Sequence, residues 1–131
     1  MPSSSVVVLD CETTGLSPRS DRITEVAALR IVGARVVERY ILLVNAGVRI
    51  PAHITSLTGI TDEMIATAPR ANDVIHALVD FIASDLVVAH NASFDYGFLS
   101  AECFTARILN RSFQLLCTMR LARRLLPGCS S

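Results

Sequence analysis

Short apolar runs separated by polar segments mark the strands that the sequence predicts. Residues 6–9 and 86–89 are continuous and largely β-branched, which is typical of strands buried on both faces of a sheet. Residues 23–32 and 36–44 form two longer runs, separated by Gly33 and Ala34. Because glycine suits the first position of a II′-type turn, these two runs predict an antiparallel hairpin.

Residues 50–82 predict an irregular segment followed by two helices. The segment from residue 50 to residue 59, which begins with Ile-Pro, is expected to be irregular. Thr61 can cap a short helix that Pro69 stops, since Asp62 and Glu63 would then lie next to the positive end of that helix. Asn72 is expected to cap a longer helix whose apolar positions recur at helical spacing, namely Ile75, Leu78, Val79 and Ile82.

The remainder of the chain predicts a helix, a short strand and a last helix. Ser93 is expected to cap a helix that runs to about Leu109, and residues 115–117 are expected to form a strand. Thr118 is expected to cap the last helix, which would run through Leu126 and end at Pro127-Gly128. The order of elements predicts an α/β fold, in which a mixed sheet has helices on its faces. Ligands of such sheets bind beyond the carboxyl ends of the central strands.

Composition indicates one folded domain and argues against a strongly basic protein that binds polyanions over its whole surface. The chain has 131 residues, of which 51% are hydrophobic and 18% are charged, and its formal net charge is +0. All twelve Lys-or-Arg residues are arginine, and the five that follow residue 104 have no acid among them: Arg107, Arg111, Arg120, Arg123 and Arg124. These five indicate either a solvated helix face or a small phosphate-facing patch.

Cysteine spacing and hydropathy indicate the compartment. None of the four cysteines forms a Cys-x-x-Cys pair, and Cys11, Cys103 and Cys117 stand in apolar runs, so we expect buried thiols in a reducing compartment. No apolar run approaches the ~18–20 residues of a membrane span, and the N-terminus has no signal-peptide pattern. We therefore expect a cytoplasmic protein without membrane association.

Carboxylates at the ends of the two short apolar runs are the first candidates for chemistry. Asp10 and Glu12 are two residues apart in a strand, so their side chains lie on the same side of it. Asp95 stands one turn into the next expected helix, and it would face both acids if the two strands are neighbours. Oxygen ligands suit Mg²⁺ or Mn²⁺, and two such ions can stabilise an in-line phosphoryl displacement. Taken singly, the residues also have ordinary explanations, because a strand-end Asp-x-Glu is common and Asp95 can be a first-turn helix acid.

Two motifs together resemble a known family. Residues 7–16 (VVLDCETTGL) and 90–95 (HNASFD) resemble the first two motifs of the DnaQ-like, or DEDD, 3′→5′ exonucleases. Residues 21–28 (DRITEVAA), 50–64 and 117–128 resemble further segments of the same family. The resemblance covers nearly the whole chain, and it is closest to the branch around the epsilon subunit of DNA polymerase III.

The resemblance implies a fold and a site. The fold would be RNase H-like, with a mixed five-stranded sheet and flanking helices, and Asp10, Glu12 and Asp95 would be catalytic ligands of two Mg²⁺ or Mn²⁺ ions. The residues around the terminal nucleotide would be Thr13, Thr14, Gly15, Leu16, His90, Asn91 and Phe94. The segment that holds Leu57 and Ile60 would supply an apolar wedge beside the last base, with Leu57 as the first choice for this role. Leu57 as an ordinary core residue remains the alternative.

The third motif of the family has no counterpart in the sequence. That motif carries a general-base histidine and a fourth carboxylate, whereas residues 96–131 contain no His, no Asp and one acid, Glu102, which is expected to lie too far from Asp95 to join the site. Of the other histidines, His76 is expected to be structural, and His53 can approach a substrate or remain uninvolved. We therefore expect a single exonuclease domain over residues 1–131 that lacks the third-motif segment, through fragmentation, natural truncation or completion by a partner chain. A sheet face left uncovered would favour self-association.

These observations support one leading function and several alternatives. The leading hypothesis is a metal-dependent 3′→5′ exonuclease that acts on single-stranded 3′ ends of DNA in proofreading or repair, with a DNA polymerase subunit as a partner. The alternatives are a catalytically incomplete module that docks on a polymerase or a nucleic-acid end, and an exonuclease that trims RNA. A phosphatase with Asp10 as nucleophile is disfavoured by the Thr-Thr-Gly turn and by residues 90–95.

Overall fold

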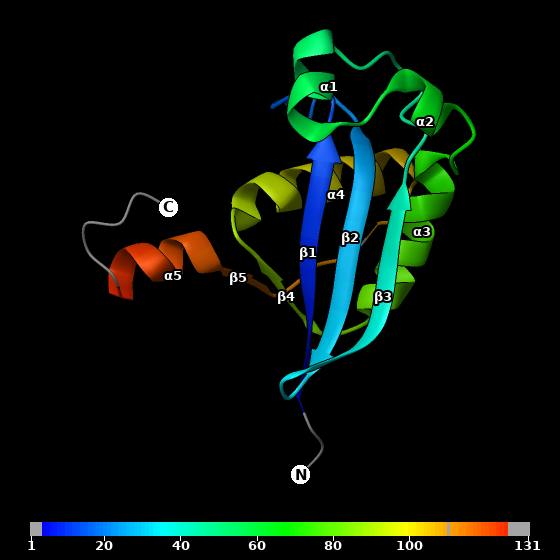
Figure 1. Ribbon diagram of the computed structural model, residues 1–131. Helices are drawn as coiled ribbons and strands as arrows, with labels where there is room; N and C mark the ends of the chain where they lie inside the picture. Colours follow the sequence, from blue (N-terminus) through cyan, green and yellow to red (C-terminus); the bar gives the residue numbers. More distant parts are fainter. Residues whose placement is uncertain (1–3, 110, 126–131) are drawn as a thin grey trace.

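The protein is built on one five-stranded mixed sheet with helices packed against it. The structure, a computed structural model, describes residues 4–109 and 111–125. The strand order is β3-β2-β1-β4-β5, and Figure 1 shows the helices relative to the sheet. The strands are β1 (Ser5–Thr13), β2 (Ile23–Val32), β3 (Arg35–Leu43), β4 (Leu86–Ala89) and β5 (Leu115–Cys117). The helices are α1 (Ala52–Thr58), α2 (Asp62–Ala66), α3 (Ala71–Ile82), α4 (Ala92–Thr105) and α5 (Thr118–Leu125).

Strand pairing confirms the predicted mixed sheet. β1, β2 and β3 pair antiparallel, whereas β4 pairs parallel to β1 and β5 pairs parallel to β4. Gly33, between β2 and β3, has a φ of +61°, which is the positive φ that the first position of the predicted hairpin turn requires. The register places Asp10 opposite Ala27 and Glu12 opposite Glu25. Asp10 and Glu12, the two acids of β1, therefore lie near the carboxyl end of this strand, at one end of the sheet.

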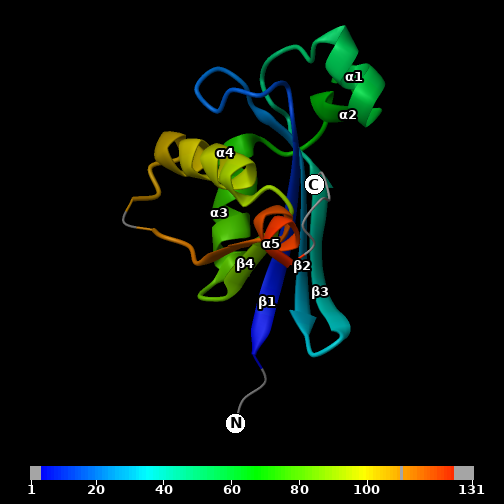
Figure 2. The same cartoon turned by 90° about the vertical axis from the view of Figure 1, so that its left-hand side faces the viewer.

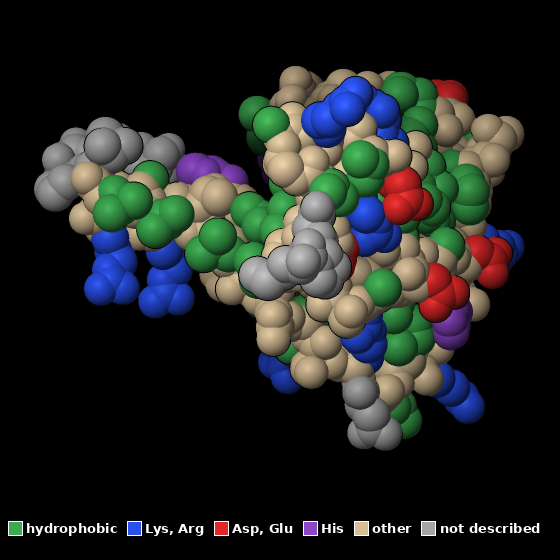
Figure 3. All heavy atoms as spheres, turned by 90° about the horizontal axis from the view of Figure 1, so that it is seen from below, with side chains coloured by type: hydrophobic (Ala, Val, Ile, Leu, Met, Phe, Trp, Pro, Cys, Tyr) green, Lys and Arg blue, Asp and Glu red, His purple; other side chains and the backbone are tan. Residues whose placement is uncertain are grey.

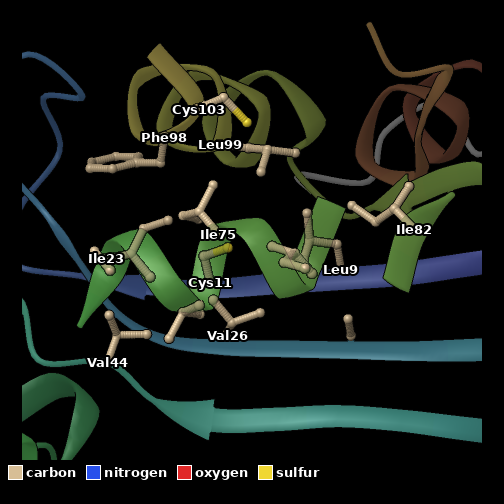
Figure 4. Close-up of a cluster of buried hydrophobic side chains, with 14 of the residues drawn as sticks. Leu9, Cys11, Ile23, Val26, Val44, Ile75, Ile82, Phe98, Leu99 and Cys103 are labelled. Carbon is tan, nitrogen blue, oxygen red and sulfur yellow. The ribbon is translucent and has the colours of Figure 1, made fainter. Parts of the chain in front are cut away.

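The core lies between the sheet and two helices on the same face of it. In Figure 2, α3 and α4 cover one side of the sheet, and their apolar side chains meet those of β1 and β2. α3 contributes the predicted stripe, of which Ile75, Leu78 and Ile82 are fully buried and Val79 is partly buried. Figure 4 shows Phe98 and Leu99 of α4 above this stripe, and Leu9, Cys11 and Val26 of the sheet below it. A smaller cluster holds α1 and α2: Ala46, Ile50, Ile60 and Ile65.

The opposite face of β1, β2 and β3 is open. No helix of the described part of the chain lies over it in Figure 2, and α5 projects from the β5 edge, away from these three strands (Figure 1). Val36, Val37 and Ile41 of β3 are correspondingly exposed. The open sheet face that the sequence led us to expect is thus present, and self-association through it stays a prediction.

α1 contradicts the expected irregular segment at residues 50–59. The chain forms a seven-residue helix there, with Pro51 at its N-cap and Gly59, at φ +77°, donating its N–H to the carbonyl of Thr55. The helix buries none of its residues, so it has no apolar period for the sequence pattern to reveal. The proline before it and the glycine after it were the available signals.

Helix starts are correct at α2 and wrong at three other helices. The hydroxyl of Thr61 accepts the N–H of Met64 as predicted, although α2 ends at Ala66, before Pro69. α3 begins at Ala71 with Arg70 as its N-cap, because a bridge between Arg70 and Asn45 holds the backbone before Asn72. α4 is capped by Asn91 rather than by Ser93, and Thr118 is the first residue of α5 rather than its cap.

α4 ends earlier than the sequence predicted. α4 stops at Thr105 instead of continuing to about Leu109, because Arg107 takes a left-handed φ of +60° and Ile108 donates its N–H back to the carbonyl of Cys103. A non-glycine residue in this conformation gives no sequence signal. The expected end of the last helix at Leu126 and Pro127-Gly128 lies outside the described residues.

The cysteines and the arginines separate into different environments. Cys11 and Cys103 are buried as predicted, but Cys117 is only half-buried, because it ends β5 at the sheet edge, where its thiol donates to the carbonyl of His90. Arg111 stacks on the ring of Phe113 and donates to the carbonyl of Ala83. The exposed arginines Arg120, Arg123 and Arg124 lie on α5, and Figure 3 shows basic side chains projecting from it.

Among the described helices, none has the length and apolar character of a membrane span.

Candidate functional site

Asp95 lies beside β1 because β4 is short. The parallel pairing of Val8 with Val88 brings the carboxyl ends of β1 and β4 to the same end of the sheet, and β4 ends at Ala89. The backbone N–H of Cys11, which no residue of β4 reaches, donates to Oδ1 of Asp95 at 3.2 Å. The side chain of Asp95 therefore lies against the backbone of β1 at Cys11, the residue between Asp10 and Glu12.

Burial and neighbouring charges raise the pKa of two of the three carboxylates, Asp95 and Glu12. Asp95 is 5% exposed, and burial, followed by the charge of Asp10, raises its pKa to about 6. Burial and the charges of Asp10 and Glu25 raise the pKa of Glu12. None of these carboxylates takes part in an ion pair within residues 4–109 and 111–125. The end of β1 is thus a cluster of acids without a protein cation to neutralise it.

The donor chemistry of this cluster fits a hard divalent cation, but a complete ligand set is not assembled. Carboxylate oxygens are the ligands that Mg²⁺ and Mn²⁺ prefer. Across the described ranges, no three His, Cys, Asp or Glu side chains are arranged to hold a metal ion together. One oxygen of Asp95 accepts the N–H of Cys11, while Asp10 is exposed and Glu12 half-buried. The residues present thus supply the right kind of atoms without a closed coordination shell.

The turn after β1 is shaped by its own hydrogen bonds. Thr13 and Thr14 are buried, and the hydroxyl of Thr13 donates to the carbonyl of Gly15 at 2.6 Å. Leu16, at the tip, is 83% exposed. The turn therefore presents one apolar side chain to solvent at the end of the sheet where the carboxylates lie.

Leu57 is not a core residue. It lies on α1, where its side chain is 80% exposed, which excludes the core interpretation. Ile60, by contrast, is buried in the small cluster that anchors α1 and α2. In Figure 1, α1 lies at the end of the molecule toward which β1 points. Of the two residues in the expected wedge segment, only Leu57 is available for contact, and the exposed His53 lies one helical turn before it.

His90, Asn91 and Phe94 follow β4 and differ in exposure. His90 and Asn91 are exposed, and Nδ1 of His90 lies 3.1 Å from the hydroxyl of Thr118. Phe94 packs against the core, with its ring 5.0 Å from that of Phe98. His90 and Asn91 can therefore contact a ligand at this end of the sheet, whereas Phe94 offers only part of its surface.

A partly buried pair of charged residues joins the turn after β1 to α4, and Arg22, one of the two, also donates its backbone N–H to the hydroxyl of Thr14. Glu102 is 4% exposed, and both of its oxygens accept from the guanidinium of Arg22, each at 2.9 Å. This pair occupies Glu102 away from Asp10 and Glu12, in line with the expectation that it would not join them. The two residues are 80 positions apart, so no local pattern announces the pair. His76 is exposed on α3 and away from these groups.

Comparison with known proteins identifies the family. The RNase_T family model, described as "Exonuclease", matches residues 7–131. DNA polymerase III PolC-type from Oceanobacillus iheyensis is 41% identical over 121 residues, which cover 92% of this chain and 8% of that protein. DNA polymerase III subunit epsilon from Aquifex aeolicus is 33% identical over 124 residues, which cover 93% of this chain and 60% of that protein.

Solved structures show the same arrangement. Exonuclease X in complex with 5′ overhanging duplex DNA superposes with a TM-score of 0.76 at 32% identity, over 95% of this chain and 66% of that one. Product-bound exonuclease I has a TM-score of 0.81 at 16% identity, over 99% of this chain and 34% of that one, and this likeness supports the fold. The chain thus spans less than two thirds of the length of each of these proteins.

Proposed function

Because the chain belongs to the exonuclease family whose model matches residues 7–131, we propose that it hydrolyses terminal phosphodiester bonds of DNA in the 3′→5′ direction. The observation that carries this proposal is the group of three carboxylates at the joined ends of β1 and β4. Burial and mutual repulsion raise the pKa of Asp95 to about 6, and no described side chain neutralises the group. A protein that keeps such a group without a protein cation favours a bound one.

Asp10, Glu12 and Asp95 would hold Mg²⁺ or Mn²⁺ in this proposal, as two ions. Divalent ions, when bound there, supply charge neutralisation for the in-line displacement at the terminal phosphate. The chain's own contribution is to fix the acids: the N–H of Cys11 orients Asp95, and the strand geometry keeps Asp10 and Glu12 on one side of β1.

The remaining site residues would orient the terminal nucleotide. The turn of residues 13–16 would border the sugar and phosphate, and His90 and Asn91 would approach from the end of β4. Leu57 would pack against the last base, a contact that does not depend on base identity because every base has an apolar face. The exposure of Leu57 is compatible with this role, because its side chain is not packed in the core.

DNA is the proposed substrate, and replication or repair is the proposed setting. Two of the relatives are replicative polymerase components by name, and the solved relative that is 32% identical is bound to duplex DNA with an overhang. Association with a DNA polymerase subunit is part of this proposal. RNA trimming remains the competing substrate class, and matched DNA and RNA strands separate the two.

The direct test uses the 131-residue chain with single strands labelled at the 3′ or the 5′ end, in Mg²⁺ and in Mn²⁺. Release of labelled mononucleotide from the 3′ end alone supports the proposal. The matched control is Asp10→Asn, which keeps the shape of the side chain and removes its charge. A folded wild-type chain that neither binds nor shortens 3′ ends of DNA or RNA would overturn the proposal.

A second candidate is a binding module without hydrolysis. It is favoured by one specific observation, namely that residues 96–131 contain no histidine to act as a general base. The same experiment discriminates the two functions. Tight binding of 3′ ends in Mn²⁺ without any release indicates the module, whereas release indicates the enzyme.

A further inference from the structure

The loop between β1 and β2 contains Asp21, a carboxylate to which the proposed function assigns no role. Asp21 accepts two hydrogen bonds within this loop, from the hydroxyl of Thr14 to Oδ1 at 3.1 Å and from the N–H of Ser17 to Oδ2 at 3.0 Å. One side chain therefore fixes both sides of the turn formed by residues 13–16.

Gly15 lies so close to the side chain of Asp21 that a larger residue at position 15 would displace that carboxylate. A Cβ atom on Gly15 would lie 2.4 Å from Oδ2 of Asp21 and 2.6 Å from its Cγ, well inside contact distance. The backbone of the turn therefore rests directly on the carboxylate. Any shift of Asp21 moves the backbone of Gly15, and with it the neighbouring side chain of Leu16.

The far end of the loop is tied back to the turn. The N–H of Thr14 donates to the carbonyl of Arg22 at 2.9 Å, and the N–H of Arg22 donates to the hydroxyl of Thr14 at 3.0 Å. Thr14 is 3% exposed, so these bonds are shielded from water. The loop is thus closed on itself through Thr14, with Asp21 and Arg22 as the two partners.

The loop is also fixed to the helix that carries Asp95, at two points. The guanidinium of Arg22 binds the buried carboxylate of Glu102 through two N–H donors, a geometry that restricts orientation as well as distance. Pro18 lies so close to Gly97 that a Cβ there would be 3.1 Å from its Cγ. Both contact points, Gly97 and Glu102, are on α4, as is Asp95.

We infer that Asp21, together with Arg22, positions the turn of residues 13–16 relative to Asp95, and that this positioning sets the affinity for the terminal nucleotide. The inference rests on the proposed function and deepens it. Asp21 is a positioning residue, because it touches the turn and not the reacting atoms. It would hold the turn in a fixed position relative to Asp95 on α4.

The test compares Asp21→Ala and Asp21→Asn with the wild-type chain. Alanine removes both acceptors, whereas asparagine can accept the N–H of Ser17 and donate to the hydroxyl of Thr14. The matched control is Asp85→Ala, which removes a carboxylate that binds Ser5 and Arg30 at the other end of the sheet. The probe is a short DNA strand with a fluorescent label at its 5′ end, titrated in Mn²⁺.

The expected result separates positioning from folding. Asp21→Ala weakens binding of the 3′ end about tenfold, with kcat changed much less wherever turnover is measurable, since the lost contacts act on bound substrate and transition state alike. Asp21→Asn restores most of the affinity. Asp85→Ala lowers the melting temperature and leaves affinity at the wild-type level. Equal affinity of Asp21→Ala and wild type would overturn the inference.

Hydrogen exchange tests the loop without any substrate. In Asp21→Ala, the amides of Thr14 and Ser17 should exchange at least about tenfold faster, while amides of β1 and β2 keep their protection. Unchanged exchange at both amides would also overturn the inference. Wild-type chain that binds no 3′ end overturns the proposed function instead, so the two failures are distinguishable.

Discussion

The two ends of the sheet treat acidic side chains in opposite ways. At the amino end of β1, Asp85 binds the hydroxyl of Ser5 and the guanidinium of Arg30, and Arg30 also binds Glu38. The same guanidinium stacks on the ring of Phe81. At the carboxyl end, Asp10, Glu12 and Asp95 have no basic partner among the described residues.

This difference supports the proposal that the carboxyl end binds a ligand. Charges at the amino end are satisfied within the chain, so that end stabilises the fold. Burial and the charge of Asp10 raise the pKa of Asp95, and the charged Asp95 makes the free protein less stable above that pKa. Under the proposed function, a bound divalent cation would offset this cost, because the acids offer the oxygen donors that such ions prefer.

The largest expected effect is at the carboxyl end. Asp10→Asn removes one charge from the acid group and should lower release of 3′ mononucleotides by about a thousandfold or more, as expected for the loss of a ligand to the catalytic ions. Mononucleotide release from a labelled strand in Mn²⁺ measures it. Asp85→Asn is the matched change at the other end of the sheet. Equal loss of activity in the two variants would contradict a functional difference between the two ends.

The next effect is on stability and belongs to the amino end. Arg30→Ala leaves the largely buried Asp85 without its charged partner and removes the stacking on Phe81, so we expect it to lower the free energy of unfolding by about 2–3 kcal/mol. Urea denaturation followed by circular dichroism measures the change. Unaltered stability would mean that these contacts do not hold the end of the sheet together.

At Asp95 we expect a smaller effect, in which the substitution increases the stability of the protein. Its pKa is raised from 3.8 to about 6 in the folded protein, so the charged form disfavours folding; this penalty grows as the pH rises from 3.8 to 6 and is fully present above 6. Asp95→Asn removes the charge and can still accept the N–H of Cys11. Without divalent ions it should be more stable than wild type by about 1–2 kcal/mol at pH 7.5.

The pH dependence supplies the check on that sign. The stability advantage of Asp95→Asn should shrink between pH 6 and pH 4, where the wild-type carboxyl becomes neutral. Thermal unfolding in a chelator across this range measures it. A variant that is less stable than wild type at pH 7.5 would contradict the assignment of Asp95 to a strained, unneutralised acid group.

The smallest expected effect on stability is at Leu57. The side chain is 80% exposed, so Leu57→Ala should change the free energy of unfolding by less than about 0.5 kcal/mol. The same variant should weaken binding of a 3′ end several-fold, by about the amount that one stacked base contributes. Ile60→Ala is the matched control, because it removes a buried neighbour and should cost stability. A Leu57→Ala variant with wild-type affinity would remove the wedge from the site.

The arrangement of strands and helices could be predicted wherever an apolar run or an apolar stripe marked the element. The β-branched runs at β1 and β4 and the α3 stripe located the core and brought Asp10 and Asp95 together. Helix boundaries were harder, because backbone contacts override side-chain propensity. Asn45 and Arg70 fix the start of α3, and the left-handed Arg107 ends α4 without a glycine.

The candidate acids could be selected from the sequence, whereas the residues that support them could not, and the role of the acids stays a prediction. Asp10, Glu12 and Asp95 stand out because polar groups at strand ends are easily recognised in a sequence. Arg22 and Glu102 are 80 residues apart, so the sequence does not reveal that they pair. Asp21 bonds to Thr14 and Ser17 in its own loop, but an aspartate in a polar loop gives no sequence signal of these bonds. The exposure of Leu57 also needed the structure, since α1 has no amphipathic pattern to orient it.

Calorimetric titration with Mn²⁺ at pH 7.5 tests the central difference between the two ends of the sheet most directly. We expect saturable binding to the wild-type chain, loss of binding in Asp10→Asn and retention of binding in Asp85→Asn. Equal binding by the wild-type chain and Asp10→Asn, or none by either, would contradict a cation site at the carboxyl end of β1.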